Sequence, residues 1–165
     1  MHYRRPAYIV IPTNVTFSTL IDESQLKVPL KHTVKELHPD EHKLVAELST
    51  ALETAKSPAI LVDVHVRQYG HEEAMHALMD RLQVHTFSTM LSKSIVDERK
   101  PYYSGMYQGD WTEPATMQRF EQADLVIRIG YTPTDYNTGS FSDKIPTEKL
   151  IDLNINWCTV RGSKP

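Results

Sequence analysis

The chain has 165 residues, a formal net charge of -3 and 24% charged residues, which is the composition of one ordinary globular domain. The sequence has no basic stripe that would indicate nucleic-acid binding. It also has no apolar run that approaches the length of a membrane span, about 20 residues. The single cysteine, Cys158, excludes an internal disulfide and fits a reducing compartment. Because the N-terminal residues also lack the apolar stretch of a signal peptide, we expect a cytoplasmic protein.

The first 39 residues differ in pattern from the rest of the chain. Residues 7–11 (Ala-Tyr-Ile-Val-Ile) predict a strand, which Pro12 ends. Residues 13–39 show no helical or strand period, and a connection of about 27 residues is too long for a compact domain. We therefore expect residues 1–12 to belong to another structural unit and residues 13–39 to be an interdomain linker.

At Asp40 the pattern changes to helices that alternate with buried strands. A helix with one apolar face is predicted up to Pro58. Its face consists of Leu44, Val45, Leu48, Ala51, Leu52 and Ala55. Residues 59–65 are largely apolar and predict a buried strand. Gly70 opens a second helix, whose inward side chains are Ala74, Met75, Leu78, Met79 and Leu82.

The alternation continues through the second half of the chain. Three further strands are predicted, over residues 84–90, 124–130 and 150–155. Residues 91–109 are expected to form a loop, and Thr112 can cap a third helix. The inward side chains of that helix are Met117, Phe120 and Ala123. Together these elements predict an α/β fold, a doubly wound, Rossmann-like parallel sheet in three layers. Few residues follow Ile155, so we expect the domain of residues 40–165 to lack its last helix.

The stretch from Asp124 to Phe141 pairs a buried strand with a polar loop. Gly130 closes the apolar run, and the loop contains Pro133 and Gly139 as turn residues. Ligands and partner surfaces gather at the carboxyl ends of strands in open α/β sheets. His65, at the end of the first core strand, occupies a similar place. A structural turn without chemistry remains the alternative for the loop.

The sequence offers no self-contained active site. His71 and His76 are five residues apart, so on a helix their rings diverge by about 140° and cannot form a zinc-protease pair. His38 and His42 have a suitable spacing but no third ligand. The turn at residues 65–70 has one glycine where a dinucleotide fingerprint has three. We therefore predict no catalytic, cofactor-binding or metal-binding residue in this chain.

Four stretches of the chain carry a resemblance to a known family. Residues 5–14 are similar to the segment that closes its pyrimidine-binding domain, and residues 55–63 to the entry into its middle domain. Residues 97–109 match a loop with spaced Pro, Tyr and Gly. Residues 123–126 and the Tyr-Asn-Thr-Gly-Ser-Phe-Ser of 136–142 match the strand and loop of its decarboxylase branch. In this order, the stretches resemble the middle domain of thiamine-diphosphate-dependent 2-oxo acid decarboxylases, the pyruvate and indolepyruvate decarboxylase family.

The resemblance implies a division into three parts and a reaction. Residues 1–12 would end the pyrimidine-binding domain, 13–39 would be the linker, and 40–165 the middle domain. The parent enzyme would use thiamine diphosphate and Mg²⁺ to convert a 2-oxo acid to an aldehyde and CO2. In the family these groups are held by the pyrimidine- and pyrophosphate-binding domains, the latter through a Gly-Asp-Gly motif that is absent from this chain. The expected partners are therefore those two domains and further copies of the parent, and no cofactor is expected here.

The resemblance also marks positions with a regulatory or interface role. In some fungal members the turn after the first middle-domain strand carries a cysteine linked to activation by substrate, and His65 is expected at that place, facing a domain interface. The residues implied for such a role are His65, Asn137, Thr138, Gly139, Ser140 and Phe141. Two other functions remain open, a free-standing nucleotide-binding module for FAD or ADP and a metal-dependent hydrolase built on the histidines.

Overall fold

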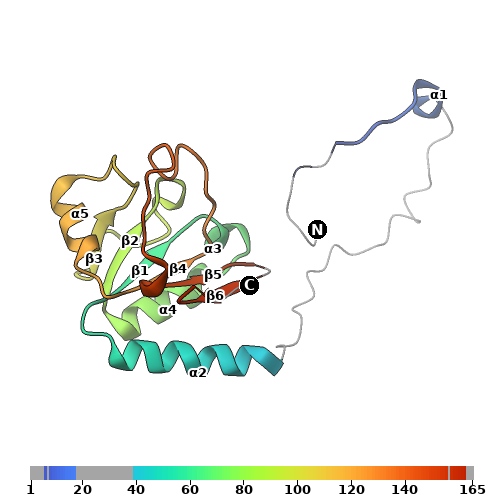
Figure 1. Ribbon diagram of the computed structural model, residues 1–165. Helices are drawn as coiled ribbons and strands as arrows, with labels where there is room; N and C mark the ends of the chain where they lie inside the picture. The colour runs from blue at the N-terminus through green and yellow to red at the C-terminus, as the bar shows by residue number, and fades with distance from the viewer. Residues whose placement is uncertain (1–5, 7, 18–38, 156, 163–165) are drawn as a thin grey trace. The chain divides into compact units, whose positions relative to one another are not determined.

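Six strands form one sheet in the order β3-β2-β1-β4-β5-β6 (Figure 1). Their bounds are Pro58–Val62 (β1), His85–Ser88 (β2), Tyr103–Met106 (β3), Leu125–Ile129 (β4), Leu150–Leu153 (β5) and Cys158–Val160 (β6). Neighbouring strands are parallel except for β6, which runs antiparallel to β5. The predicted α/β fold with a parallel sheet is confirmed, and an antiparallel edge strand is added to it.

The computed structural model describes residues 6, 8–17, 39–155 and 157–162, in two units that comprise residues 1–38 and 39–165. In the first unit, residues 8–11 are exposed and form no strand, contrary to the prediction. An extended segment without a neighbouring strand cannot complete its backbone hydrogen bonds with another strand. A short helix, α1 (Thr13–Thr16), follows. The rest of the predicted linker, from residue 18 to 38, lies outside the described residues.

Helices cover both faces of the sheet, as the alternation of elements predicts. One face carries α2 (Pro39–Thr54), α3 (His65–Gln68) and α4 (Glu72–Leu82), and the opposite face carries α5 (Pro114–Glu121). Among the residues that the structure describes, the 3-10 helices η2 (Met90–Ser92) and η3 (Thr147–Lys149) lie in connections. Within the described part of the chain, no helix has both the length and the apolar character needed to cross a membrane.

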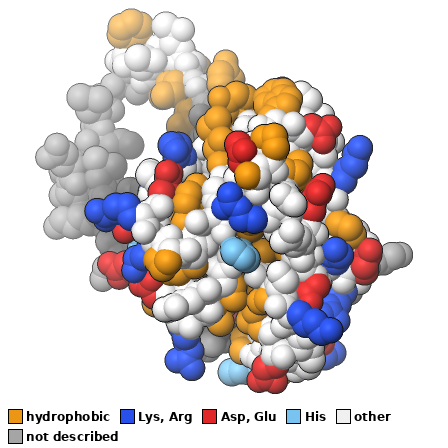
Figure 2. Space-filling view, turned by 90° about the vertical axis from the view of Figure 1, so that its left-hand side faces the viewer, with side chains coloured by type: hydrophobic (Ala, Val, Ile, Leu, Met, Phe, Trp, Pro, Cys, Tyr) orange, Lys and Arg blue, Asp and Glu red, His pale blue; other side chains and the backbone are white. Residues whose placement is uncertain are grey.

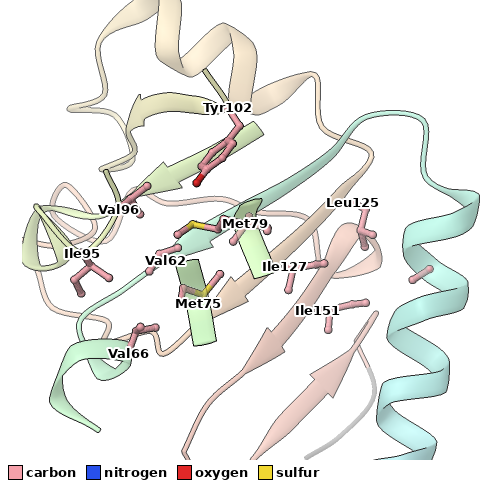
Figure 3. Close-up of a cluster of buried hydrophobic side chains, with 12 residues drawn as sticks. Val62, Val66, Met75, Met79, Ile95, Val96, Tyr102, Leu125, Ile127 and Ile151 are labelled. Atoms are coloured by element: carbon pink, nitrogen blue, oxygen red, sulfur yellow. The ribbon is translucent and has the colours of Figure 1, made fainter. Parts of the chain in front are cut away.

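Successive side chains of β1 enter two different cores, because each face of the sheet is covered. Val62 packs with Met75 and Met79 of α4 in one core (Figure 3). Leu61 belongs to the other core, with Phe120 of α5. Burying one such side chain contributes about 1.5–3 kcal/mol. The two apolar faces explain why β1 is a continuous hydrophobic run in the sequence.

Two strands escaped prediction because they lie at the edges of the sheet. β3 falls inside residues 91–109, which we expected to form a loop, and Ser104 is its only buried side chain. β6 has three half-buried residues. Neither strand has the apolar run by which buried strands are recognised.

The start of α5 differs from the prediction as well. The Thr112 hydroxyl donates to the Gly109 carbonyl oxygen at 2.6 Å and closes the preceding turn. The cap is instead Glu113, whose carboxylate accepts from the N–H groups of Ala115 (3.0 Å) and Thr116 (2.9 Å). These bonds lower the pKa of Glu113. Pro114 after the cap fits the first helical position.

Three smaller differences concern the helices on the first face. Met75 and Met79 are buried as expected, but Ala74 of α4 and Val45 of α2 are exposed. The apolar stripes that contact the sheet are therefore narrower than the periodicity suggests. His65 begins α3, because β1 already ends at Val62.

Candidate functional site

The polar loop after β4 begins at Gly130, where the backbone is left-handed (φ 71°). A Cβ at this position would lie 3.0 Å from both the Cβ of His65 and the backbone nitrogen of Val66. Glycine therefore allows the end of β4 to approach the start of α3 closely. The close approach brings the loop to the carboxyl-terminal end of β1. Ligands were expected at this end of the parallel strands.

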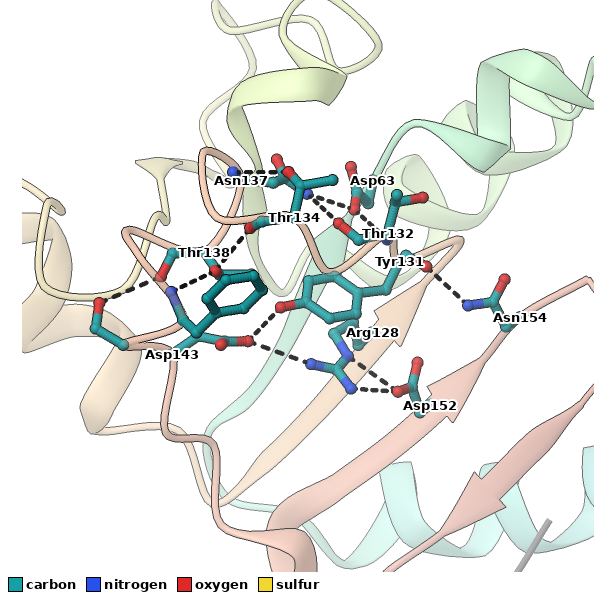
Figure 4. A network of polar contacts seen from close by, with 12 residues as sticks. Asp63, Arg128, Tyr131, Thr132, Thr134, Asn137, Thr138, Asp143, Asp152 and Asn154 are labelled. Atoms are coloured by element: carbon teal, nitrogen blue, oxygen red, sulfur yellow. Dashed lines mark hydrogen bonds and ion pairs between the residues drawn. The ribbon is translucent and has the colours of Figure 1, made fainter. Parts of the chain in front are cut away.

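Asp63, directly after β1, is the centre of a polar network at the carboxyl-terminal ends of the strands (Figure 4). Its side chain is fully buried. Its carboxylate accepts four hydrogen bonds, from Thr89 Oγ1 (2.6 Å), Val64 N (2.6 Å), Thr132 N (2.7 Å) and Asn137 Nδ2 (2.8 Å). Burial raises the pKa of Asp63, and the hydrogen bonds oppose that shift only in part.

Asn137 joins three separate segments of the chain. Its amide nitrogen donates to Asp63 and also to the carbonyl oxygen of Thr132 at 3.0 Å. Its amide oxygen accepts from the backbone N–H of Leu91, after β2, at 3.2 Å. Asn137 is 2% exposed. Because its buried amide bonds to all three segments, it acts as a structural clamp between them.

The residues after Asn137 form a turn of left-handed backbone. Gly139, Ser140 and Phe141 have φ values of 59°, 60° and 61°. A Cβ at Gly139 would overlap the carbonyl oxygen of Gln108, so this position requires glycine for space as well as for conformation. The Thr138 hydroxyl stabilises the turn, because it donates to the Thr134 carbonyl oxygen (2.7 Å) and accepts from the Phe141 N–H (2.8 Å).

Both ring nitrogens of His65 are hydrogen-bonded. Nδ1 lies 3.0 Å from Oδ1 of Asn154, and Nε2 lies 3.1 Å from the hydroxyl of Thr132. The Asn154 amide nitrogen donates to the Tyr131 carbonyl oxygen at 2.8 Å, so Oδ1 faces the ring as an acceptor. Nδ1 therefore carries a hydrogen, and Nε2 can accept one from the hydroxyl. The half-buried ring ties the start of α3 to the ends of β4 and β5.

A second network fixes the far side of the same loop. Arg128 of β4 forms an ion pair with the buried Asp152 of β5 through Nε (3.1 Å) and Nη2, and its Nη1 lies 3.6 Å from Asp143. The guanidinium carbon lies 3.7 Å from the centre of the Tyr131 ring. Tyr131 donates its hydroxyl hydrogen to Asp143. Burial and this bond raise the pKa of Tyr131.

The described residues offer no cluster of metal-binding side chains. Among them, no group of three or more His, Cys, Asp or Glu side chains could hold a metal ion. At the end of β4, the Thr132 N–H donates to Asp63 and is therefore not available to a ligand. We therefore derive no catalytic step from the residues at the carboxyl-terminal ends of these strands.

The structure brings some of the predicted residues together and separates others. His65 and Asn137 both bond to Thr132, and Thr138 and Gly139 are buried. Ser140 and Phe141 are exposed instead. Sequence reasoning missed the central acceptor, Asp63, because a polar residue after an apolar run reads as the end of a strand. An aspartate at that point, facing a loop rich in donors, was the available signal.

The chain is similar in sequence to known proteins. The sequence profile described as "Thiamine pyrophosphate enzyme, central domain" matches residues 45–164. A Schizosaccharomyces pombe protein described as a candidate pyruvate decarboxylase is 32% identical over 159 residues, which are 96% of this chain and 28% of that protein. The pyruvate decarboxylase of Candida albicans is 32% identical over 167 aligned residues, again 96% of this chain and 28% of the relative.

A solved structure is also similar. It is the X-ray structure of a candidate thiamin diphosphate-dependent enzyme from Mycobacterium smegmatis, with 22% identity and a TM-score of 0.48 over 64% of this chain and 22% of that one. The chain thus spans only 28% of the length of the two fungal relatives. Since the profile covers most of its sequence, the chain belongs to the family of thiamine pyrophosphate enzyme central domains.

Proposed function

We propose that the chain is the middle domain of a 2-oxo acid decarboxylase that uses thiamine diphosphate and Mg²⁺. The parent enzyme would convert a 2-oxo acid such as pyruvate to an aldehyde and CO2, in the cytoplasm and as a homo-oligomer. The observation that carries this proposal is the match of residues 45–164 to the central-domain profile, together with pyruvate decarboxylases among the relatives.

Within that enzyme, the chain acts as a structural and regulatory scaffold. The saturation of Asp63 and Asn137 by internal hydrogen bonds supports this role, because such groups hold strand ends in place and are not free to bind a ligand. The chemistry is supplied by the pyrimidine- and pyrophosphate-binding domains of the same polypeptide, which hold the cofactor and the metal ion.

The proposal is tested by comparing the full reading frame that contains this chain with the 165-residue chain alone. With thiamine diphosphate and Mg²⁺, the full-length protein should release aldehyde from pyruvate, measured through a coupled alcohol dehydrogenase. In calorimetry, the 165-residue chain should bind neither thiamine diphosphate with Mg²⁺ nor FAD, ADP or NAD. Binding of FAD or ADP by the chain would favour the nucleotide-binding module, and cofactor binding or turnover by the chain alone would overturn the proposal.

We further propose that His65 lies at an interface of the parent enzyme and influences its response to substrate. The ring connects α3 with β4 and β5, so its removal should alter how these ends are presented to a neighbouring domain. His65→Ala should change the shape of the substrate-saturation curve, while the exposed control His71→Ala should leave it as in wild type. An unchanged curve for His65→Ala, with a normal unfolding temperature, would contradict the role.

A further inference from the structure

A pocket lies at the amino-terminal ends of the parallel strands, the ends opposite to the network around Asp63. Its volume is about 330 Å³, and it opens where β1 and β2 begin. A pocket of this size can hold a small organic molecule. Its lining includes Lys56, Pro58, Gln83, Val84, His85 and Pro101. We call it the amino-end pocket, and it shares no residue with the two networks described above.

The lining of the amino-end pocket contains a basic residue and no acidic one. The ammonium group of Lys56 forms neither an ion pair nor a hydrogen bond with the residues that the structure describes. Figure 2 shows acidic and basic side chains interspersed on the side of the molecule that carries α5 and β3, so the surface there has no field of one sign. The charge that a ligand meets is therefore determined by the lining itself. An anionic group is complementary to it.

The tautomer of His85 is fixed by Ser104 of β3. Nδ1 of His85 lies 2.7 Å from the Ser104 hydroxyl oxygen. That hydroxyl donates its own hydrogen to the Tyr102 carbonyl oxygen at 3.3 Å, so the hydrogen between the two side chains belongs to Nδ1. In the neutral ring, Nε2 then carries a lone pair, and it bonds to none of the described residues. Nε2 is therefore available to accept a hydrogen from a ligand hydroxyl.

Apolar side chains complete the lining. Pro58 and Val84 are half-buried, and Pro101 is exposed. They offer a surface on which a short hydrocarbon chain can lie. Ligand sites commonly combine such apolar walls with a few polar groups that fix the orientation of the ligand.

We propose that the amino-end pocket binds a small hydroxycarboxylate with an apolar body. The carboxylate pairs with Lys56, the ligand hydroxyl donates to Nε2 of His85, and the hydrocarbon part lies against the two prolines and Val84. Ser104 is a positioning residue, because it keeps the hydrogen on Nδ1 and leaves Nε2 as the acceptor. The pocket plays no part in the decarboxylation proposed above, so this site does not depend on the reaction of the parent enzyme.

Isothermal titration calorimetry of the full-length protein, loaded with thiamine diphosphate and Mg²⁺, tests the proposal. The probes are 2-hydroxyisocaproate and isocaproate, which differ only by the hydroxyl group. Wild type should bind the hydroxy acid about fivefold more tightly, because only this probe donates a hydrogen bond to His85. In His85→Leu, the two probes should bind equally. In Lys56→Met, both should bind about fivefold more weakly, and the preference for the hydroxy acid should persist.

Two matched controls are available on α2. His42 and Lys43 are exposed like His85 and Lys56, so all four substitutions leave the core intact. His42→Leu and Lys43→Met should retain the affinities and the preference of wild type. Since every variant keeps the same catalytic domains, binding of either probe to the active site of the parent contributes equally to all of them.

The remaining outcomes overturn the proposal. Equal binding of the two probes by wild type, or a preference that persists in His85→Leu, would mean that His85 does not recognise the hydroxyl. Tighter binding of inorganic phosphate than of 2-hydroxyisocaproate would identify a general anion site. Equal losses in the α2 controls would place the binding elsewhere. The decarboxylation assay on the same preparations tests the proposed function separately, because an active enzyme that fails these titrations refutes the pocket alone.

Discussion

Replacement of Asp63 by alanine is expected to lower the free energy of unfolding by about 3–5 kcal/mol. The substitution leaves four donors without their acceptor, including the hydroxyl of Thr89 and the amide of Asn137, and all of them meet at a fully buried position. Buried donors without partners lose their hydration and gain nothing in return. Urea unfolding of the 165-residue chain, followed by circular dichroism, measures the loss.

The matched control for this substitution is Asp110→Ala, because Asp110 is exposed. Its effect should stay within about 0.5 kcal/mol, as for other surface positions. Equal effects of the two substitutions would mean that the network around Asp63 does not stabilise the fold.

The raised pKa of Asp63 also gives the network a dependence on pH. A carboxyl whose pKa is higher in the folded than in the unfolded state stabilises fully below its unfolded pKa of about 3.9. That contribution is lost as the pH rises through the folded pKa. The stability of wild type relative to the non-titrating Asp63→Asn should therefore decrease as the pH rises above about 4 and through the folded pKa. A difference that increases with pH would contradict the raised pKa.

The second large effect is expected from Arg128→Met, which should also destabilise the chain by about 3–5 kcal/mol. Arg128 pairs with Asp152, whose side chain is 2% exposed, so its loss leaves a buried carboxylate without its cation. Oδ1 of Asp152 already has no hydrogen-bond partner among the described residues. Chemical unfolding of the variant measures the effect.

The double substitution Arg128→Met and Asp152→Leu separates loss of the ion pair from loss of packing. Apolar side chains of similar size can replace a buried ion pair at little cost. The double variant should therefore recover most of the stability lost in Arg128→Met. A double variant that is less stable than either single one would show that shape, and not the uncompensated charge, determines the effect.

The sequence was sufficient to predict the elements that are buried on both sides. β1 is a continuous apolar run, β4 is apolar except for Arg128, and Met75 and Met79 repeat at the helical period, so the parallel sheet and its helices follow from pattern. β3 and β6 could not be found in this way, because edge strands bury few side chains and carry little periodicity. Of the strand expected at residues 7–11, the described residues 8–11 form none.

The candidate site was predictable in its location but not in its contacts. The Asn-Thr-Gly-Ser-Phe segment and His65 stand out through a family resemblance, but their partners Asp63 and Asn154 do not. Such pairings depend on tertiary proximity, for which local patterns have no signal. Exposure of Phe141 was equally inaccessible, since an aromatic residue near a glycine is more often buried than presented to water.

The hydrogen bond between Asp63 and Asn137 joins residues 74 positions apart in the chain. A contact of such separation forms only after the intervening strands have paired, because the chain must first lose the entropy of closing a long loop. The clamp should therefore be absent from the folding transition state. Substitution of Asn137 would then leave the refolding rate nearly unchanged and accelerate unfolding. The clamp would thus determine the lifetime of the folded domain and not its folding rate.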